Sequence, residues 1–212
     1  MDVYRTEEEQ VEAIKSWWRE NGRSAVFGVV LGLGAIFGWR GWQSWEHARA
    51  EAASAQYQEM LESARAGSSD AATKTGEDLA SGHGGGAYSA FARLRLAALA
   101  MDARDLDAAA EHLRLALEQN PAPELEMEIR IRLARVHAAR KDFDAALKLI
   151  EAPAVVDGYA GPVEELRGDV EAARGNVEAA REAYRKARSS AGGAQDGLLE
   201  LKLEALGSRA ES

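Results

Sequence analysis

Between Arg23 and Arg40 the chain carries sixteen consecutive residues without a charge, and no other stretch of the sequence is like it. As an α-helix, sixteen residues rise about 24 Å, less than the ~30 Å hydrocarbon core of a bilayer. The two arginines can extend toward the headgroups, and the glycine and tryptophan residues beside them lengthen the tolerable span. The sequence therefore predicts a transmembrane helix over residues 23–43, surrounded by the lipid bilayer.

The tryptophans of the chain support this prediction, because all five bracket the uncharged stretch. Indole rings gather at both membrane interfaces in this way, whereas a buried core helix gives no reason to place tryptophan only at its two ends. We therefore expect a membrane-interface group on each side of the span: Trp17, Trp18 and Arg23 before it, and Trp39, Arg40, Trp42 and Trp45 after it.

A cleavable signal peptide is the main alternative, because Ala48-Arg49-Ala50 matches the A-x-A cleavage pattern. Cleavage there would remove about fifty residues, whereas signal peptides run to roughly 15–30 residues and begin with a basic leader. The residues before this span are rich in glutamate, so we expect the helix to be retained. More lysine and arginine residues precede the span than closely follow it, and the positive-inside rule then predicts a cytoplasmic N-terminus and an exported C-terminal part.

Two glycine pairs lie within the span, Gly28-x-x-x-Gly32 and Gly34-x-x-x-Gly38. Small residues four positions apart let membrane helices approach closely. At about 100° per residue the two pairs point to faces roughly 120° apart, so two neighbouring helices can pack at once. We predict helix packing at these glycines; the alternative is that glycine is simply common in membrane helices.

Outside the span the sequence is dominated by alanine, glutamate, leucine and arginine, and it has no alternating run of β-branched residues. This composition favours helix throughout, so the predicted fold class is all-α. The net charge of −9 and the lack of a block rich in lysine and arginine argue against a nucleic-acid partner. Cysteine is absent, which excludes disulfides, thiol catalysis and cysteine-based metal sites.

An internal repeat follows the span. Segments that begin at Ala97, Ala134 and Gly168 align without gaps, each with a small residue, a turn residue, an apolar residue, an alanine and a bulky residue. The later landmarks are Asp105, Leu106, Ala109 and Leu113; Asp142, Phe143, Ala146 and Ile150; and Asn176, Val177, Ala180 and Tyr184. Small residues let two antiparallel helices cross closely, the Asp or Asn caps the second helix, and the bulky residue fills the seam. Because one hairpin cannot bury its apolar face alone, neighbouring hairpins are expected to stack.

The spacing and landmarks resemble those of tetratricopeptide repeats, and Pro121 falls where that repeat usually ends. The resemblance implies a helical-hairpin solenoid whose first helices line a concave groove for a partner protein. The groove positions correspond to a candidate set of Phe91, Leu94, Met101, Ile131 and Arg135. Apolar side chains beside an arginine suit a peptide or helix that carries a carboxylate. The alternative is that Phe91 and Leu94 pack against the preceding helix, residues 44–66.

Over its whole length the chain resembles the YfgM family, the ancillary SecYEG translocon subunits of bacterial inner membranes. The likeness is most specific at EEQVEAIKSWWRENG before the span and at GVVLGLGAIFGWR within it. It implies association with the SecYEG translocon and a periplasmic repeat domain that works with a membrane-anchored periplasmic chaperone. It also implies a non-enzymatic role in passing newly translocated proteins onward.

Four parts are expected: a cytoplasmic amphipathic leader (1–22), the single transmembrane helix (23–43), a connecting helix with a flexible linker (44–85) and the repeat domain (86–212). Val11, Ile14 and Trp18 share one face of the leader, which can lie in the membrane interface, bind a partner, or only continue the span. An alternative function follows from this leader: a membrane-anchored regulatory repeat protein that binds a cytoplasmic signalling partner.

No catalytic, cofactor or metal site and no small-molecule substrate is expected. His83-Gly84-Gly85-Gly86 matches an oxyanion-hole signature of some esterases, but no G-x-S-x-G nucleophile elbow accompanies it. The four histidines do not have the spacing of metal ligands, and the many glutamates are interpreted as solvated helix faces.

Overall fold

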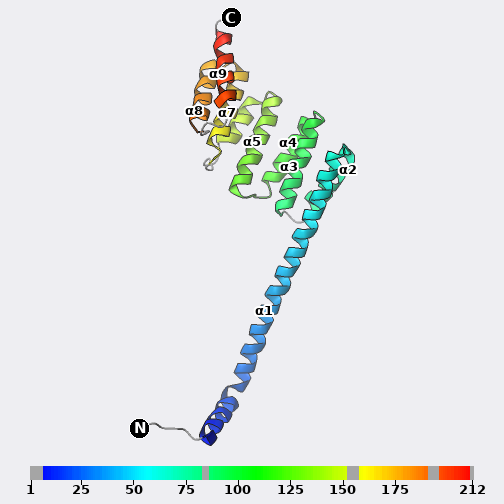
Figure 1. Ribbon diagram of the computed structural model, residues 1–212, viewed down its shortest axis with the longest axis vertical. Helices are drawn as coiled ribbons and strands as arrows, with labels where there is room; N and C mark the ends of the chain where they lie inside the picture. Colours follow the sequence, from blue (N-terminus) through cyan, green and yellow to red (C-terminus); the bar gives the residue numbers. More distant parts are fainter. Residues whose placement is uncertain (1–6, 83–85, 152–157, 191–195, 211–212) are drawn as a thin grey trace, which may run out of the picture. The chain divides into compact units, whose positions relative to one another are not determined.

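The computed structural model describes residues 7–82, 86–151, 158–190 and 196–210, and within these ranges the chain is helical, with short turns and no β-strand (Figure 1). The helices are α1 (Glu7–Arg65), α2 (Ser69–Gly82), α3 (Ala87–Asp102), α4 (Leu106–Leu117), α5 (Pro123–Ala139), α6 (Phe143–Glu151), α7 (Ala160–Arg174), α8 (Val177–Ser190) and α9 (Asp196–Ala210). Two compact units divide the chain, Met1–Glu51 and Ala52–Ser212. The predicted all-α class is confirmed.

Stacked helical hairpins make up the second unit. The pairs α3–α4, α5–α6 and α7–α8 are the three predicted repeats, and Figure 1 shows α3, α4 and α5 side by side. The small and bulky landmarks of the repeat are all buried at the crossings: Ala97, Ala109, Leu113, Ala134, Ala146, Ile150, Gly168, Ala180 and Tyr184. The helical-hairpin array predicted from the repeat is therefore confirmed.

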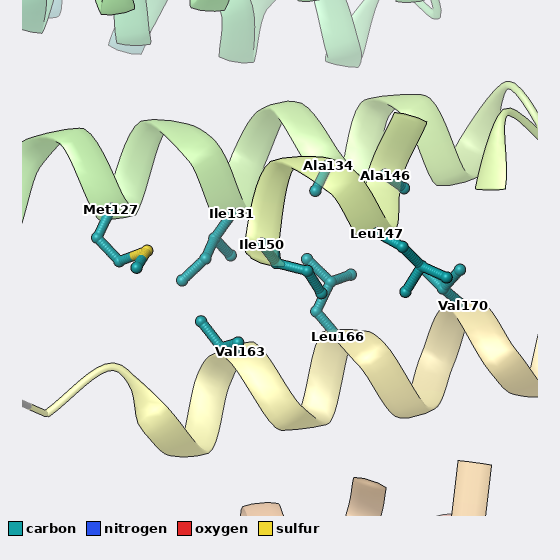
Figure 2. Packing of buried hydrophobic residues seen from close by; sticks show 9 residues of the cluster. All are labelled: Met127, Ile131, Ala134, Ala146, Leu147, Ile150, Val163, Leu166 and Val170. Carbon is teal, nitrogen blue, oxygen red and sulfur yellow. The ribbon is translucent and has the colours of Figure 1, made fainter. Parts of the chain in front are cut away.

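The core of the second unit is a row of apolar clusters rather than one centre. Figure 2 shows one cluster, in which α5 contributes Met127, Ile131 and Ala134, α6 contributes Ala146, Leu147 and Ile150, and α7 contributes Val163, Leu166 and Val170. The neighbouring clusters use α3, α4 and α5 on one side and α8 and α9 on the other. Each hairpin therefore completes its burial on the next one.

The turn inside each hairpin repeats the same backbone conformation. Arg104, Lys141 and Gly175 have φ angles of 61°, 64° and 85°, in the left-handed region where a helix commonly ends. As predicted, Asp105 Oδ1 accepts a hydrogen bond from the Ala108 amide at 2.9 Å, and Asp142 accepts a longer one from Ala145. The described hydrogen bonds do not include the predicted cap by Asn176, whose Nδ2 donates to the Glu171 carboxylate at 2.6 Å.

Helix α2 corrects the prediction of a flexible linker after residue 66. Ala72, Gly76, Leu79 and Ala80 are buried on one side of α2, and Met60 of α1 packs with them in the same cluster. The buried Ser89 hydroxyl of α3 donates to the Ala80 carbonyl at 2.8 Å, and it accepts a hydrogen bond from Gln119. The Ser, Thr and Gly composition concealed a buried face with helical spacing; residues 83–85, which hold most of the His-Gly-Gly-Gly match, lie outside the described residues.

A cluster of charged groups fixes α9 against α7 and α8. Lys202 Nζ donates hydrogen bonds to Glu165 Oε1 at 2.7 Å and to Asp169 Oδ1 at 2.6 Å. The Tyr184 hydroxyl donates to the same Asp169 oxygen at 2.8 Å. Burial, together with this bond to Asp169, raises the pKa of Tyr184 well above its usual range. Burial alone would lower the pKa of Lys202, but its two carboxylate partners outweigh that effect and raise it.

Gly168→Ala tests the close crossing of α7 and α8. An added Cβ would lie 2.4 Å from atoms of the Tyr184 ring, whose hydroxyl is bound to Asp169. We expect the free energy of unfolding to fall by about 1–3 kcal/mol, measured by urea denaturation of residues 44–212. Gly207→Ala in α9 is the matched control, because nothing lies within 4 Å of its added Cβ. Equal effects at the two glycines would contradict the crossing.

The raised pKa values of Tyr184 and Lys202 predict a loss of stability in alkali. Both folded groups retain their proton at a pH where the unfolded chain releases it, so the stabilisation is complete below pH ~10 and decreases as the pH rises further. The Tyr184 contribution is at most about 1.4 kcal/mol for each pH unit. Urea denaturation between pH 8 and 12 should show a shallower decrease for Tyr184→Phe than for the wild-type chain. An unchanged slope would show that Tyr184 is not the titrating group.

Candidate membrane anchor and partner groove

The apolar stretch of α1 is exposed in the described structure. Helix α1 is the one described helix that is long and apolar enough to cross a membrane, and almost none of its apolar window is buried. Phe27, Leu31 and Phe37 each expose about two thirds of their surface. A core helix of a soluble protein would instead be covered by its own chain. The stretch is therefore suited to a membrane anchor, and α1 continues without a break through Ala48-Arg49-Ala50.

The tryptophans form one group on each side of that stretch. Trp17 and Trp18 have ring centroids 6.4 Å apart, and Trp39 and Trp42 have theirs 5.3 Å apart in an edge-on arrangement. The Arg49 guanidinium lies 5.2 Å from the centre of the Trp45 ring. All five indoles are more than half exposed, so both groups are accessible to a membrane interface. The assignment of these side chains to the two interfaces stays a prediction.

The four glycines of the predicted packing pairs leave open space on α1. A Cβ added at Gly28, Gly32, Gly34 or Gly38 would meet nothing within 4 Å. Gly22, by contrast, lies under the Trp18 indole, which would be 3.3 Å from an added Cβ. The helix backbone is therefore accessible to a neighbouring helix at both glycine pairs. Their packing stays a prediction, since it concerns a partner chain.

A groove on the second unit brings together three of the five candidate groove residues. Leu94, Met101 and Arg135 line one cavity of about 280 Å³ between α3, α4 and α5. Leu94 forms its wall and is nearly buried, whereas Met101 is 38% exposed. The other lining residues are Ala97, Ala98, Asp102, Leu113, Arg132 and Val136. We call this cavity the α3–α5 groove.

The other two candidates lie elsewhere. The prediction for Ile131 is wrong, because its side chain is 2% exposed and packs inside the cluster of Figure 2. Phe91 is 36% exposed and forms an aromatic cluster with Tyr57 and Tyr88, with ring centroids about 6 Å apart. The alternative of packing on the preceding helix therefore holds for Phe91, which contacts Tyr57, but not for Leu94, which packs with α4 and α5.

The rim of the α3–α5 groove carries charges of both signs. Arg132 and Arg135 lie on the α5 side, and Asp102 lies on the α3 side. Arg132 is bonded to Glu128 at 2.7 Å, whereas no described residue forms an ion pair with Arg135. Arg135 is exposed and thus available to a carboxylate of a partner. The groove combines an apolar wall with one accessible cation.

Within the described ranges, no group of three or more histidine or acidic side chains is placed to bind a metal ion. Several glutamates of α4 and α5 form surface ion pairs along their own helix, such as Glu111 and Glu118 with Arg114. The described part of the chain thus contains an exposed apolar helix and, described separately, an array of helical hairpins with an open groove.

Comparison with known proteins agrees with this arrangement. Residues 15–208 match the tetratricopeptide repeat-like domain family. An ancillary SecYEG translocon subunit of Escherichia coli (strain K12) is 36% identical, over 79% of this chain and 80% of that protein. The same-named proteins of Haemophilus influenzae and Aggregatibacter actinomycetemcomitans are 33% identical over 70% of this chain and 72% of the relative, and 28% identical over 96% and 100%.

The chain belongs to the family of ancillary SecYEG translocon subunits. The family resemblance seen in the sequence is thereby confirmed. Residues of the α3–α5 groove that the sequence did not single out include Arg132 and Asp102. Arg132 lies three positions before Arg135, a helical spacing that places both arginines on one side of α5. The groove positions of the tetratricopeptide pattern include Arg135 but not Arg132.

Glutamate substitutions at Leu94 and Met101 should differ in their effect on stability, because Leu94 is nearly buried and Met101 is exposed. Leu94→Glu places a charge in a nearly buried position, so it should destabilise this ancillary subunit by about 3 kcal/mol or more. Met101→Glu, at an exposed position of the same helix, should change the free energy of unfolding by less than about 1 kcal/mol. Thermal unfolding of residues 44–212 followed by circular dichroism measures both. Similar losses would mean that Met101 is part of the core.

Proposed function

We propose that this chain is a non-enzymatic accessory subunit of the SecYEG translocon in the bacterial inner membrane. The observation that carries the proposal is the similarity to ancillary SecYEG translocon subunits, which in one relative extends over 96% of this chain. The exposed apolar stretch of α1 supports it, because a subunit of a membrane complex needs a segment that enters the bilayer. The hairpin array supplies a separate surface for protein binding.

In this proposal α1 crosses the membrane once and is not cleaved. The leader before residue 23 is cytoplasmic, and the repeat unit lies in the periplasm. The distribution of lysine and arginine around the span supports this orientation, and the two tryptophan groups support the depth of the helix. The glycine pairs then face the hydrocarbon region, where close backbone approach favours contact with translocon helices.

Gly28→Leu with Gly32→Leu tests association through α1. Two leucine side chains would fill the open surface at this pair, so we expect at least about a tenfold loss of SecYEG co-purified in mild detergent. Membrane insertion should persist, because leucine favours it. Val29→Leu with Val30→Leu, at neighbouring exposed positions without a glycine, is the matched control. Undiminished recovery from the glycine variant would remove α1 packing from the proposal.

Deletion of residues 1–20 distinguishes this function from the regulatory alternative. An accessory subunit that associates through α1 should still co-purify with SecYEG after the deletion. A regulatory protein would lose its cytoplasmic partner and show no dependence on the translocon. Loss of SecYEG in the deletion variant, with α1 still inserted, would place the contact in the leader instead.

The α3–α5 groove is the proposed site for a membrane-anchored periplasmic chaperone, to which newly translocated proteins would be passed. An apolar wall formed by Leu94 and Met101, with Arg135 free of described ion pairs, suits a segment with an apolar side chain beside a carboxylate. Phe91 lies in a different aromatic cluster and is not included in this site.

Met101→Glu with Arg135→Glu should weaken capture of the periplasmic chaperone by at least about tenfold, since it removes the cation and makes the groove acidic. Both positions are exposed, so the circular dichroism spectrum should stay that of the wild type. Arg188→Glu with Ala179→Glu, at exposed positions on α8, makes the same change in net charge and serves as the control. Equal capture by the groove variant and the control would show that the chaperone binds elsewhere.

A further inference from the structure

Helix α9 has two apolar faces, of which the array buries one. Leu199 and Leu206 are 1% and 4% exposed and pack with Tyr184 and other α8 residues. Leu198 and Leu201 are 54% and 63% exposed. They lie three positions apart, so they share one face of the helix. An apolar pair of this size is thus accessible at the end of the described array.

The exposure of these leucines is not a sign of loose docking. Lys202 lies directly after Leu201, and its Nζ donates to both Glu165 and Asp169 of α7. The side chain of Lys202 is three quarters covered, and its Nζ lies 5.5 Å from the centre of the Tyr184 ring. A rotation of α9 that buried Leu198 and Leu201 would break both bonds, leaving the partly buried Glu165 without its cation and Asp169 with only the Tyr184 hydroxyl. The rotation of α9 is therefore set by this cluster.

The position of α9 after the third hairpin explains why no described second helix covers Leu198 and Leu201. In the hairpins α3–α4, α5–α6 and α7–α8, a second helix packs on each first helix. Helix α9 follows α8 as a fourth first helix, and no further helix is present among the described residues. The terminal helix of a repeat array normally shows a polar outer face to water. On α9 this outer face instead carries two leucines side by side that no described residue covers.

Acidic residues beside the leucines define the charge of the missing partner. Glu204 lies three positions after Leu201, and Glu200 lies four positions before Glu204, so both line one edge of the apolar pair. Both are exposed, and no described residue forms an ion pair with either. A second copy of this chain, with a net charge of −9, would bring further acidic groups to this edge.

We propose that Leu198, Leu201, Glu200 and Glu204, the α9 face, bind an amphipathic helix of another protein. The apolar side of that helix covers the two leucines, and its lysine or arginine side chains lie opposite the two glutamates. The bound helix takes the place of the second helix of a fourth hairpin. This surface is separate from the α3–α5 groove, and the proposal does not depend on association with the translocon through α1.

The test is photo-crosslinking of the full chain in native membranes, with a photoreactive phenylalanine analogue at position 201. The expected product joins α9 to a segment of another protein that has helical apolar spacing with lysine or arginine along one edge, identified by mass spectrometry. The same analogue at the exposed Ala139 of α5 should not give this product. Crosslinking to α9 of a second copy, to a segment without basic residues, or to lipid alone would overturn the proposal.

Charge reversal provides the second arm. Glu200→Lys with Glu204→Lys should reduce the crosslinked product at position 201 at least about tenfold, because like charges would then meet across the interface. Leu198→Gln, analysed with the photoreactive group at position 201, should reduce it as well. Both variants should unfold at the wild-type temperature, since none of these side chains is buried, whereas Leu199→Gln should unfold earlier. A product that persists undiminished in the charge-reversed, folded chain would contradict the basic partner.

Discussion

Every helical hairpin of the second unit has an apolar side that its own two helices cannot cover. The cluster of α5, α6 and α7 shows the consequence, because Val163, Leu166 and Val170 of the following hairpin complete the burial of Ile131 and Ile150. The crossing within a hairpin works only because small residues stand at the contact, and Gly168 beside the Tyr184 ring is the tightest case. Stacking thus fixes the order of the hairpins, places α3 beside α5 to form the groove, and leaves α9 with an uncovered face.

Helix α1 follows the opposite constraint. Its apolar stretch is not covered by any described part of the chain, and large side chains such as Phe27 and Phe37 are exposed along it. In water this surface would be unfavourable, whereas in a bilayer a continuous helix satisfies its own backbone hydrogen bonds and needs no cover. The apolar stretch of α1 is therefore suited to a bilayer, whereas the hairpin array buries its apolar side chains within itself.

The sequence predicted those features that depend on local periodicity. The landmarks from Ala97 to Tyr184 identified the hairpins and their turns, and Asp105 and Asp142 cap the helices that they were expected to cap. Helix α2 was missed because six of its fourteen residues are serine, threonine or glycine, although Ala72, Gly76, Leu79 and Ala80 have helical spacing. Ile131 was wrongly assigned to the groove, because its position in the repeat does not reveal which side of α5 packs against the next hairpin. The exposure of Leu198 and Leu201 could not be predicted from the sequence, because it depends on how the bonds of Lys202 to α7 orient α9.

We propose that α1 stays in the membrane as a single uncleaved span, with the repeat unit on the periplasmic side. The most direct measurement is a pair of fusions after Ser212, one to alkaline phosphatase and one to a green fluorescent protein, combined with N-terminal sequencing of the mature chain. A retained span in this orientation gives an active phosphatase, a dark fluorescent protein and an N-terminus ahead of the span. The reverse pattern of activities, or a mature N-terminus near Glu51, would contradict it.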